Sequence, residues 1–402
     1  MRNLTATNGR LLMRAQYAIT AIVLASLCCM VVSSASIAQT ESCQRMPSAD
    51  SRRAPVGIGT VVVHPALGGI ILGYDIDQNG TEGLLSEFVA LAGGKSNIAV
   101  ETFDQRTGAI IKIVTEQMDS KNSWLTWGVF GNHVGLAEFE HVTHLYVDGR
   151  SYATLDPLSG NAITGRWTPA LQKADIIQSI GQGQGFPNTA VLAFNNGANE
   201  NSFVFSSNIA ANTFGPIVNL TNSVFDANNS PVMAYDNGSH RAVLGSSLGC
   251  FGCSTTIGLA DLVTGAVTEF PGLGLGFING IAVDSTTGIA CTATEDDFSI
   301  EFYNLAMQTG FLVILPGATS QAQSGMDVEF DPINKLFLIG QEFSSTAPTG
   351  SSIQVFDEAG NFVESLNGFS LPASPAYMAL NPAKRLGYVI PSNLSILQSF
   401  TY

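Results

Sequence analysis

A two-strand hairpin pattern recurs along this chain and limits it to a β-rich repeat fold. Each copy has a short apolar run, then Asp, Asn or His, a turn-forming stretch and a second apolar run. The copies begin at Val61, Leu192, Met233, Ile281, Val328 and Met378. Apolar runs on both sides of a tight turn predict two antiparallel β-strands. Because the unit repeats along the chain, the sequence predicts a stacked or circular array.

A second hairpin follows most of the first hairpins. These second hairpins begin at Val100, Tyr152, Ile257, Ile300 and Ile353. Asp-x-x-(Ser/Thr)-Gly occurs at Asp104–Gly108, Asp156–Gly160 and Asp261–Gly265. An Asp side chain accepts backbone N–H bonds across such a turn, and Gly adopts the positive φ that lets the chain reverse. The motif is therefore expected to be structural.

Two hairpins per repeat predict an all-β fold of four-stranded antiparallel blades. The starts at 192, 233, 281, 328 and 378 are 41, 48, 47 and 50 residues apart. This spacing is typical of a β-propeller. Further starts near 61 and 127 bring the expected number of blades to seven, with six or eight as alternatives. The first blade is expected to carry a long insert between Tyr74 and Asn97.

The last blade has room for only three strands before the chain ends. A strand near Gly57–Val63 is expected to complete it, so that the ring closes without an unpaired edge. The turn residues and spacing resemble those of the YVTN/NHL-like (quinoprotein-like) β-propeller superfamily. This resemblance covers residues 57–402, and it implies the fold rather than the function, because one fold hosts many functions.

The N-terminus has the pattern of a secretory signal peptide. Arg2, Arg10 and Arg14 precede an apolar stretch, and small residues lead to Ala38. The apolar stretch is shorter than the roughly 20 residues that a membrane-spanning helix needs. The sequence thus predicts a signal peptide over residues 1–38, a tail over 39–56 and a propeller domain over 57–402. We expect a secreted or periplasmic protein with no membrane span after cleavage.

Strong negative charge narrows the range of partners. Removing residues 1–38 removes three arginines and no acid, which changes the net charge from −15 to −18. Nucleic acid is excluded as a partner, since phosphate binding needs clustered Lys and Arg. Cations, neutral polar ligands or a protein suit this charge better. A monomer is expected.

The loops between second and third strands are expected to lie on one face, together with the connections that enter the first strands. That face is the predicted ligand site. Its candidate ligand-binding residues are Asn188, Asn279, Glu295, Asp296, Asp297, Asp327, Gln341 and Glu342. The alternative for the acidic run is an exposed, solvated loop.

The most specific local motif resembles the start of a calcium-binding loop. Asp75, Asp77, Asn79 and Glu82 place oxygen-bearing side chains around Gly80, as at the start of a calcium loop. A full EF-hand would have Glu at the position of Ser86, and the flanks are not helical. The alternative is a solvated turn. The loop is expected on the same face as Cys250–Cys253 and Glu295–Asp297.

The cysteines predict a structural role. Cys250 and Cys253 are close enough for a small disulfide in an oxidising compartment. Zinc would need a second pair of ligands. Cys291 is expected to be a buried small residue in a second strand, and the pairing of Cys43 stays open.

No catalytic constellation remains once the repeats are accounted for. The sequence therefore predicts a non-catalytic binding or interaction module. The alternative is a calcium-dependent hydrolase or lactonase, which the resemblance to certain propellers implies. That enzyme would need acidic and amide side chains from different blades near the axis, and Asn188, Asn279 and Asp327 are the candidates.

Overall fold

The structure is a computed structural model, and its described residues all belong to the compact unit 51–402. They are 57–76, 81–91, 95–118, 136–139, 142–148, 151–155, 162–166, 176–182, 189–196, 201–208, 213–220, 225, 232–245, 253–276, 278–294, 298–317, 325–341, 352–367, 378–390 and 396–402. The predicted signal peptide and tail (residues 1–56) lie outside these residues and stay predictions. No helix in the described part is long and apolar enough to cross a membrane.

The strands of the described residues form seven antiparallel sheets. Sheet 1 contains β2 (Ile70–Ile76), β3 (Glu82–Leu91), β4 (Lys95–Asp104) and β5 (Ile110–Met118). Sheet 2 contains β6 (Leu136–Phe139), β7 (Val142–Asp148), β8 (Ser151–Leu155) and β9 (Ala162–Arg166). Sheet 3 contains β10 (Ile176–Gln182), β11 (Thr189–Asn196), β12 (Asn201–Asn208), β13 (Thr213–Phe214) and β14 (Val218–Asn219).

The remaining sheets are more regular. Sheet 4 contains β15 (Val232–Asp236), β16 (Arg241–Gly245), β17 (Ser254–Asp261) and β18 (Val267–Leu275). Sheet 5 contains β19 (Ile278–Asp284), β20 (Ile289–Thr294), β21 (Ser299–Asn304) and β22 (Thr309–Ile314). Sheet 6 contains β23 (Gly325–Asp331), β24 (Leu336–Gln341), β25 (Ser352–Asp357) and β26 (Phe362–Leu366). Sheet 7 contains β27 (Met378–Asn381), β28 (Leu386–Val389), β29 (Leu397–Thr401) and β1 (Gly57–Val63), with the short 3-10 helix η4 (Pro382–Lys384) after β27.

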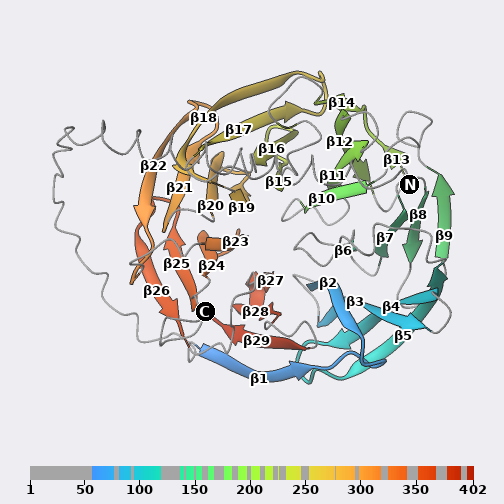
Figure 1. Cartoon of the computed structure of the whole chain (residues 1–402). Helices are drawn as coiled ribbons and strands as arrows, with labels where there is room; N and C mark the ends of the chain where they lie inside the picture. The colour runs from blue at the N-terminus through green and yellow to red at the C-terminus, as the bar shows by residue number, and fades with distance from the viewer. Residues whose placement is uncertain are drawn as a thin grey trace, which may run out of the picture. The chain divides into compact units, whose positions relative to one another are not determined.

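Neighbouring sheets pack through their first strands. Contacts join β10 to β15, β15 to β19, β19 to β23, β23 to β27, β27 to β2, and β2 to β6, while β10 also contacts β7. Figure 1 shows these first strands on the inside and the fourth strands on the outside. The sheets are therefore the blades of a β-propeller, as predicted, and their number in the described part is the expected seven.

The ring closes through the N-terminal strand, as predicted. β1 pairs with β29, so that Gly57 is opposite Thr401 and Val63 is opposite Leu397. Figure 1 shows β1, in blue, beside the red strands of sheet 7. Side chains of sheet 7 reinforce the pairing: the Ser399 hydroxyl accepts from the Val61 amide at 3.1 Å, and the Gln398 amide donates to the Gly59 carbonyl at 2.7 Å.

The predicted hairpin at Val61–Asp75 is wrong. β1 belongs to sheet 7 and β2 to sheet 1, and the two strands do not pair. The turn at 64–69 is a connection between blades, and Pro and Gly give it the appearance of a hairpin turn. Instead of a long insert, residues 82–91 form the regular strand β3, which pairs with both β2 and β4.

Two further blade starts are also corrected. The hairpin at Leu192 exists as β11 and β12, but these are the second and third strands of sheet 3, which begins with β10 at Ile176. Sheet 2 begins at Leu136 rather than near 127, and its outer hairpin at Tyr152 is present as β8 and β9. The other first hairpins, at Met233, Ile281, Val328 and Met378, and the remaining second hairpins pair as predicted.

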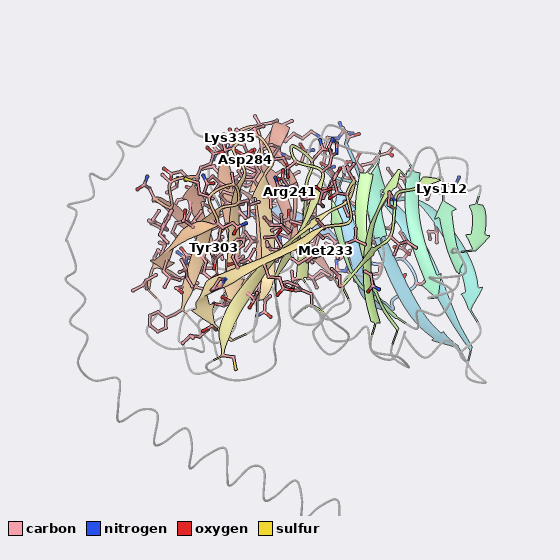
Figure 2. All side chains as sticks on the ribbon, turned by 90° about the horizontal axis from the view of Figure 1, so that it is seen from above. Lys112, Met233, Arg241, Asp284, Tyr303 and Lys335 are labelled. Carbon is pink, nitrogen blue, oxygen red and sulfur yellow. The ribbon has the colours of Figure 1, made fainter. Side chains whose placement is uncertain are left out.

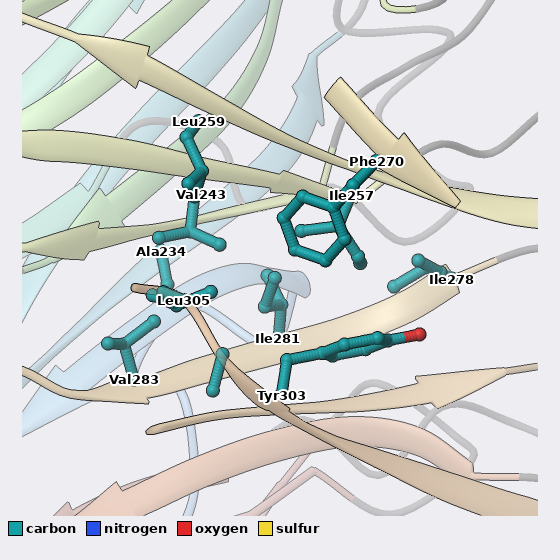
Figure 3. Close-up of a cluster of buried hydrophobic side chains, with 11 residues drawn as sticks. Ala234, Val243, Ile257, Leu259, Phe270, Ile278, Ile281, Val283, Tyr303 and Leu305 are labelled. Carbon is teal, nitrogen blue, oxygen red and sulfur yellow. The ribbon is translucent and has the colours of Figure 1, made fainter. Parts of the chain in front are cut away.

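The hydrophobic core lies between the blades rather than within one blade. One cluster joins sheets 4 and 5 and includes Val243, Phe270, Ile281, Tyr303 and Leu305. Figure 3 shows these side chains between the ribbons of the two sheets. A buried aliphatic or aromatic side chain contributes about 1.5–3 kcal/mol. Burial between blades therefore stabilises the junctions on which the ring depends.

The Asp-x-x-Thr-Gly turns are structural, as expected. One Asp104 carboxylate oxygen accepts from the Arg106 and Thr107 amides at 2.7 and 3.1 Å, and Gly108 has φ of 72°. The Asp261 turn repeats this arrangement, and Gly265 has φ of 77°. The third motif, at Asp156–Gly160, lies outside the described residues.

Polar side chains link consecutive blades at one recurring position. This position directly follows the third strand of a blade. Its side chain forms a hydrogen bond with the last residue of the first strand in the preceding blade. Tyr402 donates to the Asp331 carboxylate at 3.0 Å, and the Gln105 side chain accepts from the Asn381 amide at 2.9 Å. In sheet 5 the matching position is apolar, Leu305. One buried oxygen of Asp236, in sheet 4, accordingly has no hydrogen-bond partner in the described part of the chain.

Tyr402→Phe is expected to lower the free energy of unfolding by about 1–2 kcal/mol, since it removes a buried hydrogen bond to a carboxylate. The loss should appear in denaturant unfolding and shrink when Asp331→Asn is already present, because the two residues act as a pair. Equal losses in both backgrounds would show that the hydroxyl does not stabilise the junction through Asp331.

Candidate functional site

The blades have two distinct edges. The turn edge carries the short turns after the first and third strands, such as 284–289 and 304–309. The loop edge is where second strands end and third strands begin, at Thr294 and Ser299 in sheet 5 and at Gln341 and Ser352 in sheet 6. The predicted ligand site corresponds to the loop edge.

The calcium-loop candidate lies at the opposite edge from the one predicted. Asp75 is in β2 and Glu82 begins β3, so this turn follows a first strand and belongs to the turn edge. The expected gathering of Asp75–Glu82 with Cys250–Cys253 and Glu295–Asp297 is therefore wrong. The mistake follows from the false hairpin at Val61, which shifted the strand count of sheet 1 by one. Asp77 and Asn79 lie outside the described residues, and calcium there stays a prediction.

Two predicted ligand residues lie on the neighbouring first strands of sheets 5 and 6. Asn279 is in β19 and half-buried, and Asp327 is in the neighbouring first strand β23. Gly280 lies against the backbone of Asp327, so that an added Cβ would come within 2.7 Å of the Asp327 Cα. The absence of a side chain at Gly280 thus allows the two strands to approach closely.

A β-bulge shapes the first strand at this place. The pairing of β19 with β20 shifts between Ile278 and Gly280, which makes Asn279 the extra residue. β23 has the same irregularity between Gly325 and Asp327. Bulges re-aim side chains and occur often beside functional sites. The two bulges place Asn279 and Met326 at matching positions near the loop edge.

Asp327 is a buried carboxyl with an altered acidity. Its side chain is almost fully buried and accepts from the Met378 amide of sheet 7 at 2.7 Å. Burial raises the pKa of Asp327 to about 7, although hydrogen bonds from the Met378 and Val328 amides act in the opposite direction. Asp327 is therefore partly protonated at neutral pH and can donate as well as accept.

Gln341 belongs to a buried network rather than to an exposed loop. Its side-chain oxygen accepts from the Gln354 amide at 2.9 Å and from the Ser352 hydroxyl at 3.2 Å. In sheet 5, Thr294 and Ser299 occupy the matching ends of the strands. Their hydroxyl oxygens are buried without a hydrogen-bond partner in the described residues. The other predicted ligand residues (Asn188, Glu295, Asp296, Asp297 and Glu342) lie outside the described residues.

A buried Glu or Gln recurs in the third strands and was not predicted from the sequence. Glu101, Glu301, Gln354 and Gln398 occupy equivalent positions, three residues before the end of the strand. The first three side chains are buried, and Gln398 is half-buried. The signal was present as a Glu or Gln between apolar residues, as in Val100-Glu-Thr-Phe-Asp104 and Ile300-Glu-Phe-Tyr-Asn304.

Glu301 ties sheet 5 to sheet 4. It accepts from Tyr303 and Thr292 of its own sheet, and the Thr255 hydroxyl of sheet 4 lies 3.4 Å from it. The Tyr303 hydroxyl accepts from the Leu273 amide, also in sheet 4, at 2.8 Å. Burial raises the pKa of Glu301 above its usual range. Because its oxygens are occupied within the protein, Glu301 holds blades together and is not a ligand candidate.

An ion-pair cluster on the turn edge is also structural. The Lys335 ammonium lies 3.0 Å from both oxygens of Asp284 and 3.7 Å from Glu358. Figure 2 shows Lys335 and Asp284 close together near one edge. A hydrogen bond shared with Asp284, together with burial, raises the pKa of Glu358 to about 7. The cluster joins sheets 5 and 6 through the Lys335 ammonium.

In the described part of the chain, neither the cysteines nor metal-binding side chains add a candidate functional site. Cys291 is fully buried in β20 with a free thiol, as expected for a small core residue, and burial raises its pKa well above the usual range. Cys250 and Cys43 lie outside the described residues, so the Cys250–Cys253 disulfide stays a prediction. No group of three or more His, Cys, Asp or Glu side chains there could hold a metal ion.

The fold has a counterpart among solved structures. The chain is similar to the β-propeller domain of Cps50 (Swd1) from Myceliophteria thermophila, with 10% identity and a TM-score of 0.56. The match covers 87% of this chain and 100% of that chain. No family model matches the sequence, and no curated protein sequence matches it. At this identity the likeness shows the fold alone: the chain is an all-β protein with a β-propeller fold.

Proposed function

We infer that this protein is an exported, YVTN/NHL-like β-propeller that binds a small polar ligand or a protein at the loop edge of sheets 5 and 6, without catalysis. The observation that carries this proposal is a contrast between the two edges. Turn-edge acids such as Asp104, Asp261 and Asp331 are bonded within their own turns, and the exception in the described part is one oxygen of Asp236. At the loop edge, the buried Thr294 and Ser299 hydroxyls have no such partners in the described residues.

The chemistry of this edge suits a neutral, hydrogen-bonding ligand. Asn279 lies on β19 and the partly protonated Asp327 on the neighbouring first strand β23, and Ser299 contributes a buried hydroxyl. Small numbers of polar groups on a rigid scaffold are typical of binding sites for small polar molecules. The acidic segment 295–297 follows Thr294 directly, so a cation bound with the ligand is also compatible with the site. Export rests on the signal-peptide pattern of residues 1–38.

A ligand screen tests this function. Purified protein from residue 39 onward would be melted with neutral sugars, amino acids and short peptides, each with calcium and with a chelator. A ligand that raises the melting temperature should bind at least roughly tenfold more weakly to Asn279→Ala, the loss expected for one or two hydrogen bonds. Thr268→Ala, at an exposed position of β18 in sheet 4, is the matched control and should bind normally.

The outcomes separate binding from catalysis. Unchanged binding in both Asn279→Ala and Ser299→Ala would place the ligand elsewhere and overturn the proposed site. Turnover of lactone or ester substrates that disappears in Asp327→Asn would instead establish the hydrolase alternative. A stabilising effect of calcium that Asp77→Ala abolishes would confirm the calcium loop on the turn edge.

A further inference from the structure

The connection between sheets 7 and 1 is held by two buried glutamates. Residues 64–69 join β1, the last strand of sheet 7, to β2, the first strand of sheet 1. The Ala66 amide lies 2.9 and 3.1 Å from the two carboxylate oxygens of Glu101, on β4. The Leu67 amide donates to Glu87, on β3, at 3.1 Å, and the Gly69 amide donates to the other Glu87 oxygen. Both glutamate side chains are fully buried.

The two carboxyl groups share a hydrogen bond, which requires a proton between them. Burial raises the pKa of Glu101 to about 7, the Ala66 amide opposes this shift, and the hydrogen bond and negative charge of Glu87 add to it. Two adjacent buried carboxylates could not both ionise without strong repulsion. With one proton shared between its carboxyl groups, the pair accepts from three backbone amides.

Few other charges surround the pair in the described part of the chain. The strand β6 of sheet 2, which contacts β2 and β3, contains one acid, Glu138. His64 begins the connection and is exposed. Asp75 on β2 is paired with Leu84, and Lys112 on β5 is paired with Thr102, whose side chain points to the face of β4 opposite to that of Glu101. On the facing sheet 7, strands β1, β28 and β29 contain no acid or base other than Tyr388, whose hydroxyl donates to the Gln105 carbonyl.

Sheet 6 shows the same positions in an uncharged form. Gln341 and Gln354 are the equivalents of Glu87 and Glu101, and the Gln354 amide donates to the Gln341 side-chain oxygen at 2.9 Å. A protonated Glu101 can make the same donation to Glu87 that Gln354 makes to Gln341. The amide pair has no proton to lose in this range, whereas the acid pair has one, and the acid pair holds the connection between sheets 7 and 1.

We propose that the Glu87–Glu101 pair is a proton-dependent clasp, which fastens the connection 64–69 when it holds its proton and loosens the closure of the ring when it loses it. The sign follows from linkage: the folded chain keeps a proton that an ordinary glutamate, with a pKa of 4.5, releases. The clasp therefore contributes full stability below about pH 4.5, and this contribution disappears as the pH rises through about 7. The pair therefore stabilises the junction of sheets 7 and 1 more at acidic pH than at alkaline pH.

Hydrogen exchange measured by mass spectrometry tests the clasp. In the wild-type chain, protection of peptides covering 64–69, corrected for the intrinsic pH dependence of exchange, should fall at least about tenfold between pH 5.5 and 8.5, the change expected for one pKa unit of differential stabilisation. Glu101→Gln should hold the protection of 64–69 constant over this range, because the Gln amide replaces the shared proton.

A matched variant tests the exposed histidine at the start of the connection. His64→Gln removes the exposed imidazole at the start of the connection and should leave the wild-type pH dependence unchanged. Protection of 64–69 that is flat with pH in the wild type would overturn the proposal without any variant. A Glu101→Gln chain that folds and keeps the wild-type slope, or a His64→Gln chain that loses it, would overturn it as well.

Discussion

Replacing Gly280 with valine is expected to destabilise the junction of sheets 5 and 6 by about 3 kcal/mol or more. A Cβ at this position would lie 2.5 Å from the Val328 amide nitrogen and 2.7 Å from the Asp327 Cα, and a real Cβ does not approach backbone so closely. Backbone atoms of a paired strand cannot move aside as a flexible side chain can, so β19 and β23 must separate. Overpacking of a well-packed interior usually costs about 1–3 kcal/mol, and a rigid backbone obstacle places Gly280→Val at or beyond that range.

The same change should also disturb the candidate site. Asp327 is hydrogen-bonded to the Met378 amide across the next junction, so a shift of β23 moves this carboxyl and weakens that bond. Denaturant unfolding measures the loss of stability directly. Gly288→Asn is the matched control: Gly288 is in the same sheet, has φ of 69° and would place its Cβ in open space. Asn tolerates this conformation, and the cost should stay below about 1 kcal/mol. A Gly280→Val protein as stable as Gly288→Asn would disprove the close approach of the two strands.

Local chemistry made much of the fold predictable. The turns at Asp104 and Asp261 were readable from sequence because the hydrogen bonds of the Asp side chains lie within three residues. The hairpins from Met233 onward were readable because each has two apolar runs on either side of such a turn. Closure by Gly57–Val63 was predictable for a topological reason, since a three-stranded last blade would leave an edge unpaired.

The wrong strand predictions came from segments in which a connection between two blades resembles a hairpin turn within a single blade. Residues 64–69 contain Pro and two Gly residues between apolar runs, so their sequence matches a hairpin, but three of their amides donate to Glu87 and Glu101 of the following sheet. Pairing partners more than 300 residues apart, such as Val61 and Ser399, give no local signal. The resulting shift of one strand moved the calcium-loop candidate to the wrong edge.

The candidate site was predictable only in part. Asn279 and Asp327 were identified from their places near the starts of first strands, and the structure brings those strands together. The burial of Asp327, and hence its altered acidity, depends on the packing of three sheets and could not be read from neighbouring residues. A Glu in an apolar strand marks a buried polar position, but its partners at Ala66 or Thr255 lie far away in the sequence.

Removing β1 is expected to have the second large effect, the loss of ring closure. A chain that begins at residue 64 would leave β29 as an unpaired edge, because β1 is the fourth strand of sheet 7. It would also lose the buried Val63 side chain and leave the Gln398 amide without the Gly59 carbonyl. These losses together amount to several kcal/mol, at about 1 kcal/mol for each hydrogen bond and about 1.5–3 kcal/mol for a buried Val.

The matched control is a chain that begins at residue 57, which keeps all of β1 and should unfold at the wild-type temperature. The shorter chain should melt at least roughly 10 °C lower or fail to fold, and its exposed edge should make it prone to association. Gly59→Val gives the same test without truncation, because a Cβ there would lie 3.0 Å from the Ser399 Cβ and within the space of its hydroxyl. If the shorter chain and Gly59→Val both melted as the wild type does, sheet 7 would be stable with three strands, and closure of the ring would not depend on the N-terminal strand.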